Sequence, residues 1–186
     1  MIDWAGKFAG GLPYEAFLSQ YGTEEQRRRW GEVYDRVSLS ADQSGLLSGF
    51  VREMNLLCLA GAWCGDCANQ CPILQRIAES TPKVHLVFMD RDADAVLAGE
   101  LRVCGGSRVP VVVFLSEDYA ECGRYGDRTL SRYRELAAQQ MGAACPTGLG
   151  APKESLVAVT DDWLNEFERI QLMLRLSPRL RQKHGD

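Results

Sequence analysis

The chain has 186 residues, of which 46% are hydrophobic and 25% are charged, and its formal net charge is −4. This length suits one domain with additions and allows a sizeable buried core. Nucleic acid is not expected as the main partner, because phosphate binding depends on clustered positive charge. The sequence contains no run of about 18 apolar residues, so no membrane-spanning helix and no membrane partner are predicted.

The seven cysteines are an odd number, so they cannot all pair within the chain. The first residues, MIDWAGK, lack the basic and apolar regions of a secretory signal. We therefore expect a cytoplasmic protein with reduced cysteines, where a close pair is more often catalytic or metal-binding than structural. Three cysteines are scattered: Cys104, Cys122 and Cys145. Cys145 is expected to be a bystander rather than an oxidisable thiol.

Residues 1–52 are predicted to form a helical N-terminal extension. Residues 23–26 and 40–43 each fit a capping box, and the first of these predicts a helix that runs to about Val37. Within that helix an apolar stripe recurs at helical spacing, formed by Trp30, Val33, Tyr34 and Val37. We expect the stripe to pack against the neighbouring domain rather than to form a binding groove.

Residues 53–140 predict an alternation of strands and helices. Apolar runs predict buried strands at 56–59, 84–89 and 111–115, and a returning strand at 119–125. Helices are expected at 67–79, 93–103 and 130–140, with Pro72 kinking the first. A Gly/Ala/Pro-rich linker is predicted at 141–153, followed at 154–186 by a C-terminal helical extension packing on the core. Its basic end is interpreted as a solvated helix terminus rather than a phosphate- or membrane-binding segment.

The strand at 56–59 leads into Trp63-Cys64-Gly65-Asp66-Cys67, and a helical pattern follows. Two cysteines at this spacing can share the first turn of a helix, where the helix dipole and free N–H groups favour a thiolate on Cys64. Cys67 is then close enough to displace a mixed disulfide. A CxxC motif in this context is typical of a redox pair.

Cys64, Cys67, Cys71 and Pro72 match the last part of the cysteine motif that binds the iron–sulfur cluster of bacterial ferredoxins. That motif needs a further cysteine at position 61, where this chain has glycine. Cys58 or Cys104 could supply a fourth thiolate, although structural zinc sites usually come as two paired knuckles. A metal site is therefore the less favoured interpretation, and no metal or cofactor is predicted. Cys71 is expected to be a small buried hydrophobic residue rather than a second resolving thiol.

The order of elements across residues 53–140 resembles the thioredoxin fold, an α/β fold with a central mixed sheet flanked by helices. The resemblance rests on the strand register and on four positions: Trp63, Pro72, Val109-Pro110 and Gly126. The WCGDC sequence further resembles a bacterial thioredoxin-like group with aspartate between the cysteines. This resemblance implies a thiol–disulfide oxidoreductase.

The resemblance also implies roles for the residues of the motif. Cys64 would attack a disulfide and Cys67 would resolve the intermediate, with Gly65 and Asp66 between them. A cis-proline at position 110 would present the Val109 backbone to an extended substrate and keep other ligands away from the pair. Trp63 would shape the contact surface.

Two departures from the family pattern bear on proton transfer. Asp66 stands where thioredoxins usually have proline, and its carboxylate is expected to raise the pKa of Cys64. Cys58 and Phe88 stand where thioredoxins have a buried aspartate and its lysine partner, which leaves Asp66 or water to carry protons to Cys67.

Two functions remain open at this stage. The first is catalysis, with a disulfide-containing protein or small disulfide as substrate and an unidentified electron donor. The second is a non-enzymatic adaptor or redox sensor that binds a partner through its helical extensions. A Cys–His hydrolase is not favoured, because neither His85 nor His184 is placed near Cys64 by the sequence.

Overall fold

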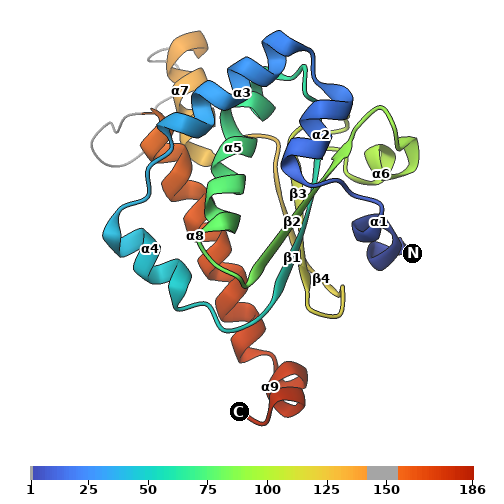
Figure 1. Ribbon diagram of the computed structural model, residues 1–186, viewed down its shortest axis with the longest axis vertical. Helices are drawn as coiled ribbons and strands as arrows, with labels where there is room; N and C mark the ends of the chain where they lie inside the picture. Colours follow the sequence, from blue (N-terminus) through green and yellow to red (C-terminus); the bar gives the residue numbers. More distant parts are fainter. Residues whose placement is uncertain (1, 142–154) are drawn as a thin grey trace.

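The computed structural model describes residues 2–141 and 155–186. Its centre is a four-stranded mixed sheet in the order β2-β1-β3-β4, shown in Figure 1. The strands are β1 (Met54–Ala60), β2 (Val84–Asp90), β3 (Val111–Ser116) and β4 (Glu121–Gly126). β1 pairs parallel to β2 and antiparallel to β3, and β3 pairs antiparallel to β4. The predicted α/β class and the predicted order of elements are confirmed.

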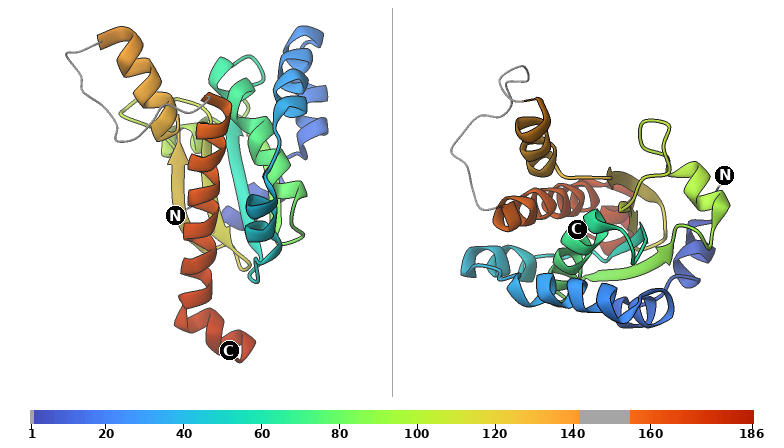
Figure 2. Two further views of the ribbon diagram at one scale, coloured as in Figure 1. Left: turned by 90° about the vertical axis from the view of Figure 1, so that its left-hand side faces the viewer. Right: turned by 90° about the horizontal axis from the view of Figure 1, so that it is seen from above.

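Helices cover this sheet in layers (Figure 2). α5 (Gly65–Glu79) contacts β2, and α8 (Ser155–Leu176) lies beside it and contacts β4. α3 (Glu24–Arg36) packs on the outside of α5. β1 and β3 are buried along their whole length because they occupy the middle of the sheet.

The N-terminal segment is helical, as predicted. Besides α3 it forms α1 (Trp4–Ala9), α2 (Tyr14–Tyr21) and α4 (Ala41–Ser48). Both predicted capping boxes are present, with Thr23 and Gln26 capping α3 and Ser40 and Gln43 capping α4. The side-chain and backbone donors at each helix start are therefore satisfied reciprocally.

The apolar stripe of α3 packs inward, which confirms the predicted role. Trp30 is fully buried and its ring lies 6.4 Å from that of Phe88 on β2. Tyr14 and Phe17 of α2 complete this aromatic cluster, with ring centres 5.8 and 5.9 Å from that of Trp30. The Trp30 indole donates a hydrogen bond of 3.1 Å to the backbone oxygen of Ala62. The extension thus fixes the chain immediately before Trp63.

The prediction that β2 is a buried strand is wrong in part. β2 lies at the edge of the sheet, and the His85 side chain is 50% exposed. Its outer edge pairs with Leu12, which exchanges backbone hydrogen bonds of 2.8 and 2.7 Å with Phe88. An apolar run does not distinguish a central strand from an edge strand covered by another segment.

Two predicted elements are shorter in the structure because turns replace their ends. α6 spans Ala95–Glu100, and a turn with Cys104 at φ 50° and Gly105 at φ 74° follows where the helix was expected to continue. β4 begins at Glu121 because Tyr119 adopts φ 62° in the preceding turn.

The C-terminal helix docks on the core, as predicted, and is longer than its apolar pattern indicated. The Gln171 side chain of α8 accepts hydrogen bonds of 3.2 and 2.8 Å from the backbone N–H groups of Val51 and Arg52. Its amide also donates a bond of 3.0 Å to the backbone oxygen of Arg52. One buried side chain therefore satisfies three backbone groups just before β1.

The interpretation of the basic C-terminal end as a solvated helix terminus is incomplete. α9 (Pro178–His184) is anchored to the turn between β3 and β4, because Lys183 and His184 both pair with Glu117, at 2.5 and 2.8 Å. Arg179 pairs with the adjacent Asp118. Leu180 of the same helix is buried.

α7 (Leu130–Met141) agrees with the predicted helix at 130–140. Most of the predicted linker, including Cys145, lies outside the described residues. Within residues 2–141 and 155–186, each helix is too short or too polar to cross a bilayer.

Replacing Gln171 by leucine is expected to lower the free energy of unfolding by about 2–4 kcal/mol. The change leaves one buried N–H group, one partly buried N–H group and one buried carbonyl without their partner. Urea unfolding measures the effect. Leu172→Ala on the exposed face of the same helix is the control and is expected to change stability by about 0.5 kcal/mol or less. Equal effects of the two substitutions would contradict this account of how α8 docks.

Candidate functional site

Cys64 occupies the N-cap position of α5, directly after the loop that follows β1. Its backbone N–H bonds to the Gly61 carbonyl at 3.0 Å, which holds the loop in a tight turn. Cys64 is partly exposed, whereas Cys67, three residues later, is completely buried. The pair therefore presents one sulfur to solvent and keeps the other inside.

The segment Val109-Pro110 lies beside the cysteine pair. The Cys64 thiol donates a hydrogen bond of 3.5 Å to the Val109 backbone oxygen, and the Val109–Pro110 peptide bond is cis. Gly126 closes this region from β4: a Cβ atom there would lie 2.3 Å from the Pro110 backbone oxygen. With φ at +146°, position 126 also favours glycine for its backbone conformation.

Trp63 stands at the rim of the site and is 45% exposed. The Arg91 guanidinium lies 4.4 Å from its ring centre, a cation–π contact. The ring also packs closely over Gly61, where a Cβ atom would approach it to 2.7 Å. Gly61 thus leaves room for the indole, which a larger side chain at this position would displace.

The ionisations of the Cys64 and Cys67 thiols are coupled, so their protons leave in two steps that belong to the pair. The neighbouring Cys67 thiol and burial raise the pKa of Cys64, while the backbone N–H groups of Asp66 and Cys67 act in the opposite direction. Burial raises the pKa of Cys67, but the neighbouring Cys64 and Cys71 thiols and the Gly61 backbone outweigh it and lower this pKa to about 5. Taken together, the two thiols release their first proton more readily than a free cysteine does.

A thiolate on Cys64 in the resting protein stays a prediction, because coupled thiols titrate as a pair. The backbone N–H groups at the start of α5 favour charge on Cys64, while Cys71 and the Gly61 backbone favour it on Cys67. The spacing of the cysteines predicts the start of the helix, but it does not predict which groups the fold brings close to Cys67. Access still favours Cys64 as the sulfur that meets a visiting molecule.

Asp66 is not the isolated carboxylate that the sequence suggested. Its side chain pairs with Arg128 at 2.6 Å and lies 3.7 Å from Arg132. Arg128 precedes α7 and Arg132 belongs to it, so both arginines lie far from Asp66 in the sequence and are brought to it by the fold. These arginines offset the repulsion that Asp66 exerts on a thiolate of Cys67.

A second carboxylate extends this network. Buried Asp127 pairs with Arg108 and Arg128, each at 3.4 Å, and accepts a hydrogen bond from the Tyr133 hydroxyl. Burial raises the pKa of Asp127, yet these partners hold it below its usual value. The amide of Gln70 on α5 bonds the Asp127 backbone oxygen at 3.0 Å. The sequence analysis missed these residues, and their only local signal is their position directly after Gly126.

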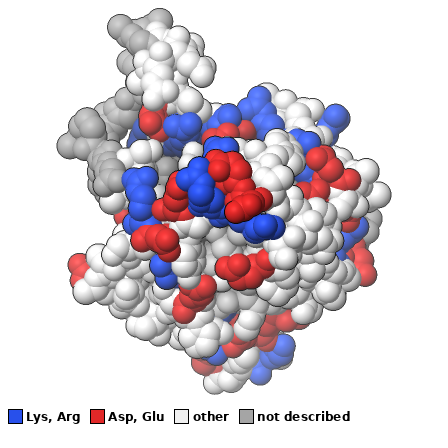
Figure 3. All heavy atoms as spheres, turned by 45° about the horizontal axis from the view of Figure 1, so that its top comes forward, with Lys and Arg blue, Asp and Glu red and all other residues white. Residues whose placement is uncertain are grey.

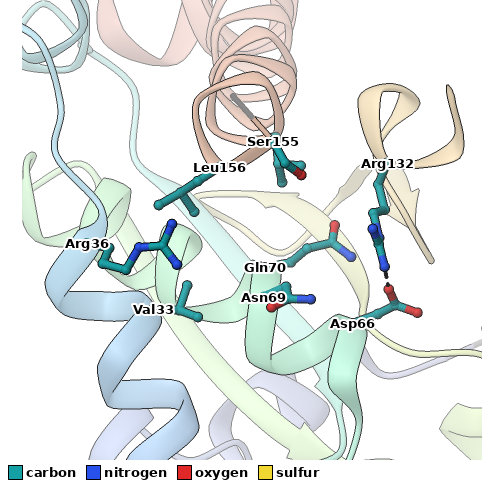
Figure 4. A pocket seen from close by; sticks show the side chains of 9 residues that line it. Val33, Arg36, Asp66, Asn69, Gln70, Arg132, Ser155 and Leu156 are labelled. Atoms are coloured by element: carbon teal, nitrogen blue, oxygen red, sulfur yellow. Dashed lines mark ion pairs between the residues drawn. The ribbon is translucent and has the colours of Figure 1, made fainter. Parts of the chain in front are cut away.

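A cavity of about 150 Å³ lies next to Asp66, between α3, α5, α7 and α8 (Figure 4). Asp66 and Arg132 face one another at one end of it, and Val33 and Leu156 contribute apolar walls. The described residues that line it include no cysteine. The cavity is therefore separate from the reactive sulfur atoms and borders only the charged side of the motif.

The two residues of the second family departure, Cys58 and Phe88, are adjacent in the sheet. Cys58 on β1 is paired in register with Phe88 on β2, and both are fully buried. Phe88 packs in the aromatic cluster with residues of α2 and α3. An apolar ring therefore occupies the position where the thioredoxin resemblance implies a lysine. Cys71 is buried, as predicted.

The described part of the chain contains no group of three or more histidine, cysteine or acidic side chains arranged to hold a metal ion. His85 pairs with Glu53, and His184 pairs with Glu117. Cys104 is exposed and Cys122 is half-buried on β4. On the face of the molecule seen in Figure 3, acidic and basic side chains are interspersed rather than gathered by sign.

Asp66→Asn is expected to lower the first apparent pKa of the cysteine pair by up to about one unit, because Arg128 then has no carboxylate to neutralise it. Arg128→Gln is expected to raise that pKa by a similar amount, and the double variant to return it towards the wild-type value. Titration of thiolate absorbance measures all three. A rise in the asparagine variant would contradict the electrostatic account.

The reduced protein is expected to gain stability as pH rises from about 5 to about 8.5. In that window the unfolded chain holds a proton on Cys67 that the folded chain has released. Above about 8.5 the sign reverses, because the folded chain retains the Cys64 proton whose pKa is raised. Urea unfolding across this range measures the effect, with Cys67→Ala as the comparison. Parallel curves for the two proteins would refute the coupling.

A thioredoxin family model matches residues 11–140 of the chain. No curated protein matches at the threshold applied. Among solved structures, a protein of unknown function from Pseudomonas aeruginosa is 19% identical with a TM-score of 0.70, and the match covers 91% of this chain and 97% of that one. An HIV epitope scaffold is 18% identical with a TM-score of 0.69 and the same coverage. Both likenesses concern the fold alone. The match over residues 11–140 shows that the chain belongs to the thioredoxin family.

Proposed function

We propose that this protein is a thiol–disulfide oxidoreductase in which Cys64 attacks and Cys67 resolves. The observation that carries the proposal is the arrangement of the two sulfurs. Cys64 is partly exposed at the N-cap of α5, and Cys67, three residues later, is buried. This arrangement suits one sulfur to bind a visitor and the other to release it.

In the proposed reaction the proton of the pair first moves to Cys67, which leaves Cys64 as the thiolate. Cys64 attacks one sulfur of the substrate disulfide, and the other substrate sulfur leaves as a thiolate. Cys67 then passes its proton to that leaving group and attacks the Cys64 sulfur. The second substrate sulfur departs, a Cys64–Cys67 disulfide forms, and two electrons have reached the substrate.

The surroundings of the pair support an extended substrate. Trp63 is exposed next to Cys64 in the sequence, the Val109 backbone oxygen contacts the Cys64 thiol, and Gly65 and Asp66 begin α5. We propose that the Val109 backbone pairs with the substrate and that Trp63 contacts it. A protein disulfide or a small disulfide fits this surface, and a separate donor must return two electrons to the pair.

We propose that the protein acts in the cytoplasm, where a close cysteine pair is more often catalytic than structural. The motif WCGDC supports placing it in the bacterial thioredoxin-like group that carries this sequence. The charge partners of Asp66 give that aspartate a defined position, so we propose that it tunes the pair rather than accepting the substrate.

An adaptor or redox sensor is the second candidate, and one observation favours it. The end of α8 exposes three large apolar side chains: Leu172, Met173 and Leu176. A partner bound there would leave the cysteine pair as a sensor. This candidate predicts binding without turnover, which separates it from catalysis.

Reduction of insulin disulfides by dithiothreitol tests the proposed catalysis. The wild-type protein is expected to accelerate the reaction, and Cys64→Ser to lose at least about 99% of the acceleration because no exposed thiolate remains. Cys104→Ser, which changes an exposed thiol outside the site, is the matched control and should retain the activity. Wild-type protein that is inactive with both dithiothreitol and glutathione as reductant would exclude catalysis in favour of the second candidate.

Cys67→Ser is expected to accumulate mixed disulfides at Cys64, because the step that releases the substrate is blocked. Non-reducing gels and peptide mass mapping identify the trapped molecules. The double variant Cys64→Ser/Cys67→Ser is the control. Equal trapping by the double variant would show that another thiol attacks.

A further inference from the structure

Two more cysteines lie beneath the site, and the proposed reaction does not use them. The sulfur atoms of Cys58 on β1 and Cys71 on α5 are 3.9 Å apart. Both residues are fully buried and both are free thiols. Cys58 lies on a central strand, so this contact joins the middle of the sheet to the inner face of the helix.

These thiols are continuous with the reactive pair. Cys71 is four residues after Cys67 on α5, which places the two side chains on the same face of the helix. Cys64 is three residues before Cys67, at the N-cap of the same helix, which places it next to Cys67. Four sulfurs therefore form a chain from the surface to the core, in the order 64, 67, 71, 58.

We propose that Cys58 and Cys71 form a second, buried dithiol that takes over the disulfide of the Cys64–Cys67 pair through Cys67. The proposal rests on the function proposed above and adds a second redox site to it. Its substrate is the internal disulfide left on the pair after one round of substrate reduction.

The transfer consists of two exchanges. The Cys71 sulfur attacks the Cys67 sulfur, the Cys64–Cys67 bond breaks, and the Cys71 proton passes to the released Cys64. The Cys58 sulfur then attacks Cys71, the Cys67–Cys71 bond breaks, and the Cys58 proton passes to Cys67. One disulfide is lost at the surface and one forms in the core, so no outside oxidant or reductant is needed.

The site permits the motion that this transfer needs. A disulfide requires its sulfurs about 2 Å apart, so Cys58 and Cys71 must approach by about 2 Å, which rotation of the two side chains can supply. Pro72 follows Cys71 inside α5 and has no N–H to bond the carbonyl one turn earlier. The turn that carries Cys67 and Cys71 therefore has one restraining hydrogen bond fewer than an ordinary helix.

The consequence is a protein that stores four electrons rather than two. After a first substrate disulfide is reduced, the relay regenerates the surface dithiol, and a second substrate can react before the external donor acts. A pair of cysteines that served only to fill the core would give no such second turnover.

The test uses the full chain, reduced, freed of reductant and incubated with excess oxidised glutathione. Samples are alkylated over time, and their disulfides are mapped by mass spectrometry. We expect a Cys64–Cys67 disulfide first, then a Cys58–Cys71 disulfide, with two equivalents of glutathione disulfide consumed. Cys67→Ser is expected to abolish the Cys58–Cys71 bond. Cys122→Ser, which changes a half-buried thiol on β4, is the control and should leave both bonds unchanged.

The outcomes are distinguishable. If the Cys64–Cys67 bond forms while Cys58 and Cys71 are still free thiols and are recovered in alkylated form, the second dithiol is excluded and the proposed function stands. If Cys58–Cys71 forms equally fast in Cys67→Ser, the relay through Cys67 is wrong. If neither bond forms, the proposed function fails and the inference fails with it. The wild-type measurement needs no substitution in the core, so a folding defect cannot imitate these results.

Discussion

The closeness of Cys64 and Cys67 at the start of α5 is the constraint on which the chemistry of this site depends. Because their ionisations are coupled, the pair releases its first proton more readily than separate thiols would. The burial of Cys67 would oppose that charge if it stood alone. The neighbouring Cys64 and Cys71 thiols and the Gly61 backbone offset the cost.

The rest of the fold holds this pair in place from three sides. Trp30 of α3 binds the backbone at Ala62, just before the motif. Val109 accepts a bond from Cys64, and Arg128 reaches Asp66 from the start of α7. The N-terminal extension and the segments before β3 and α7 therefore support the site while leaving Cys64 partly exposed.

The interior around Cys58 differs from the pattern expected for the family. Phe88 on β2 belongs to an aromatic cluster with Phe17 and Trp30, so this part of the core is apolar. A charged side chain beside Cys58 would be costly there without a partner. The proposed relay depends on the same departure from the family pattern. Position 58 carries a thiol where a carboxylate would be expected, and this thiol contacts Cys71.

The sequence by itself determined the order of strands and helices, both capping boxes, and the cysteine pair at the start of α5. These features depend on periodicity and spacing, which are local properties. The tertiary structure alone decided that β2 is an edge strand covered by Leu12, that Asp66 is paired with Arg128, and that Cys58 meets Cys71. Each of these contacts joins residues far apart in the chain, and only the packing of the sheet and its helices brings them together.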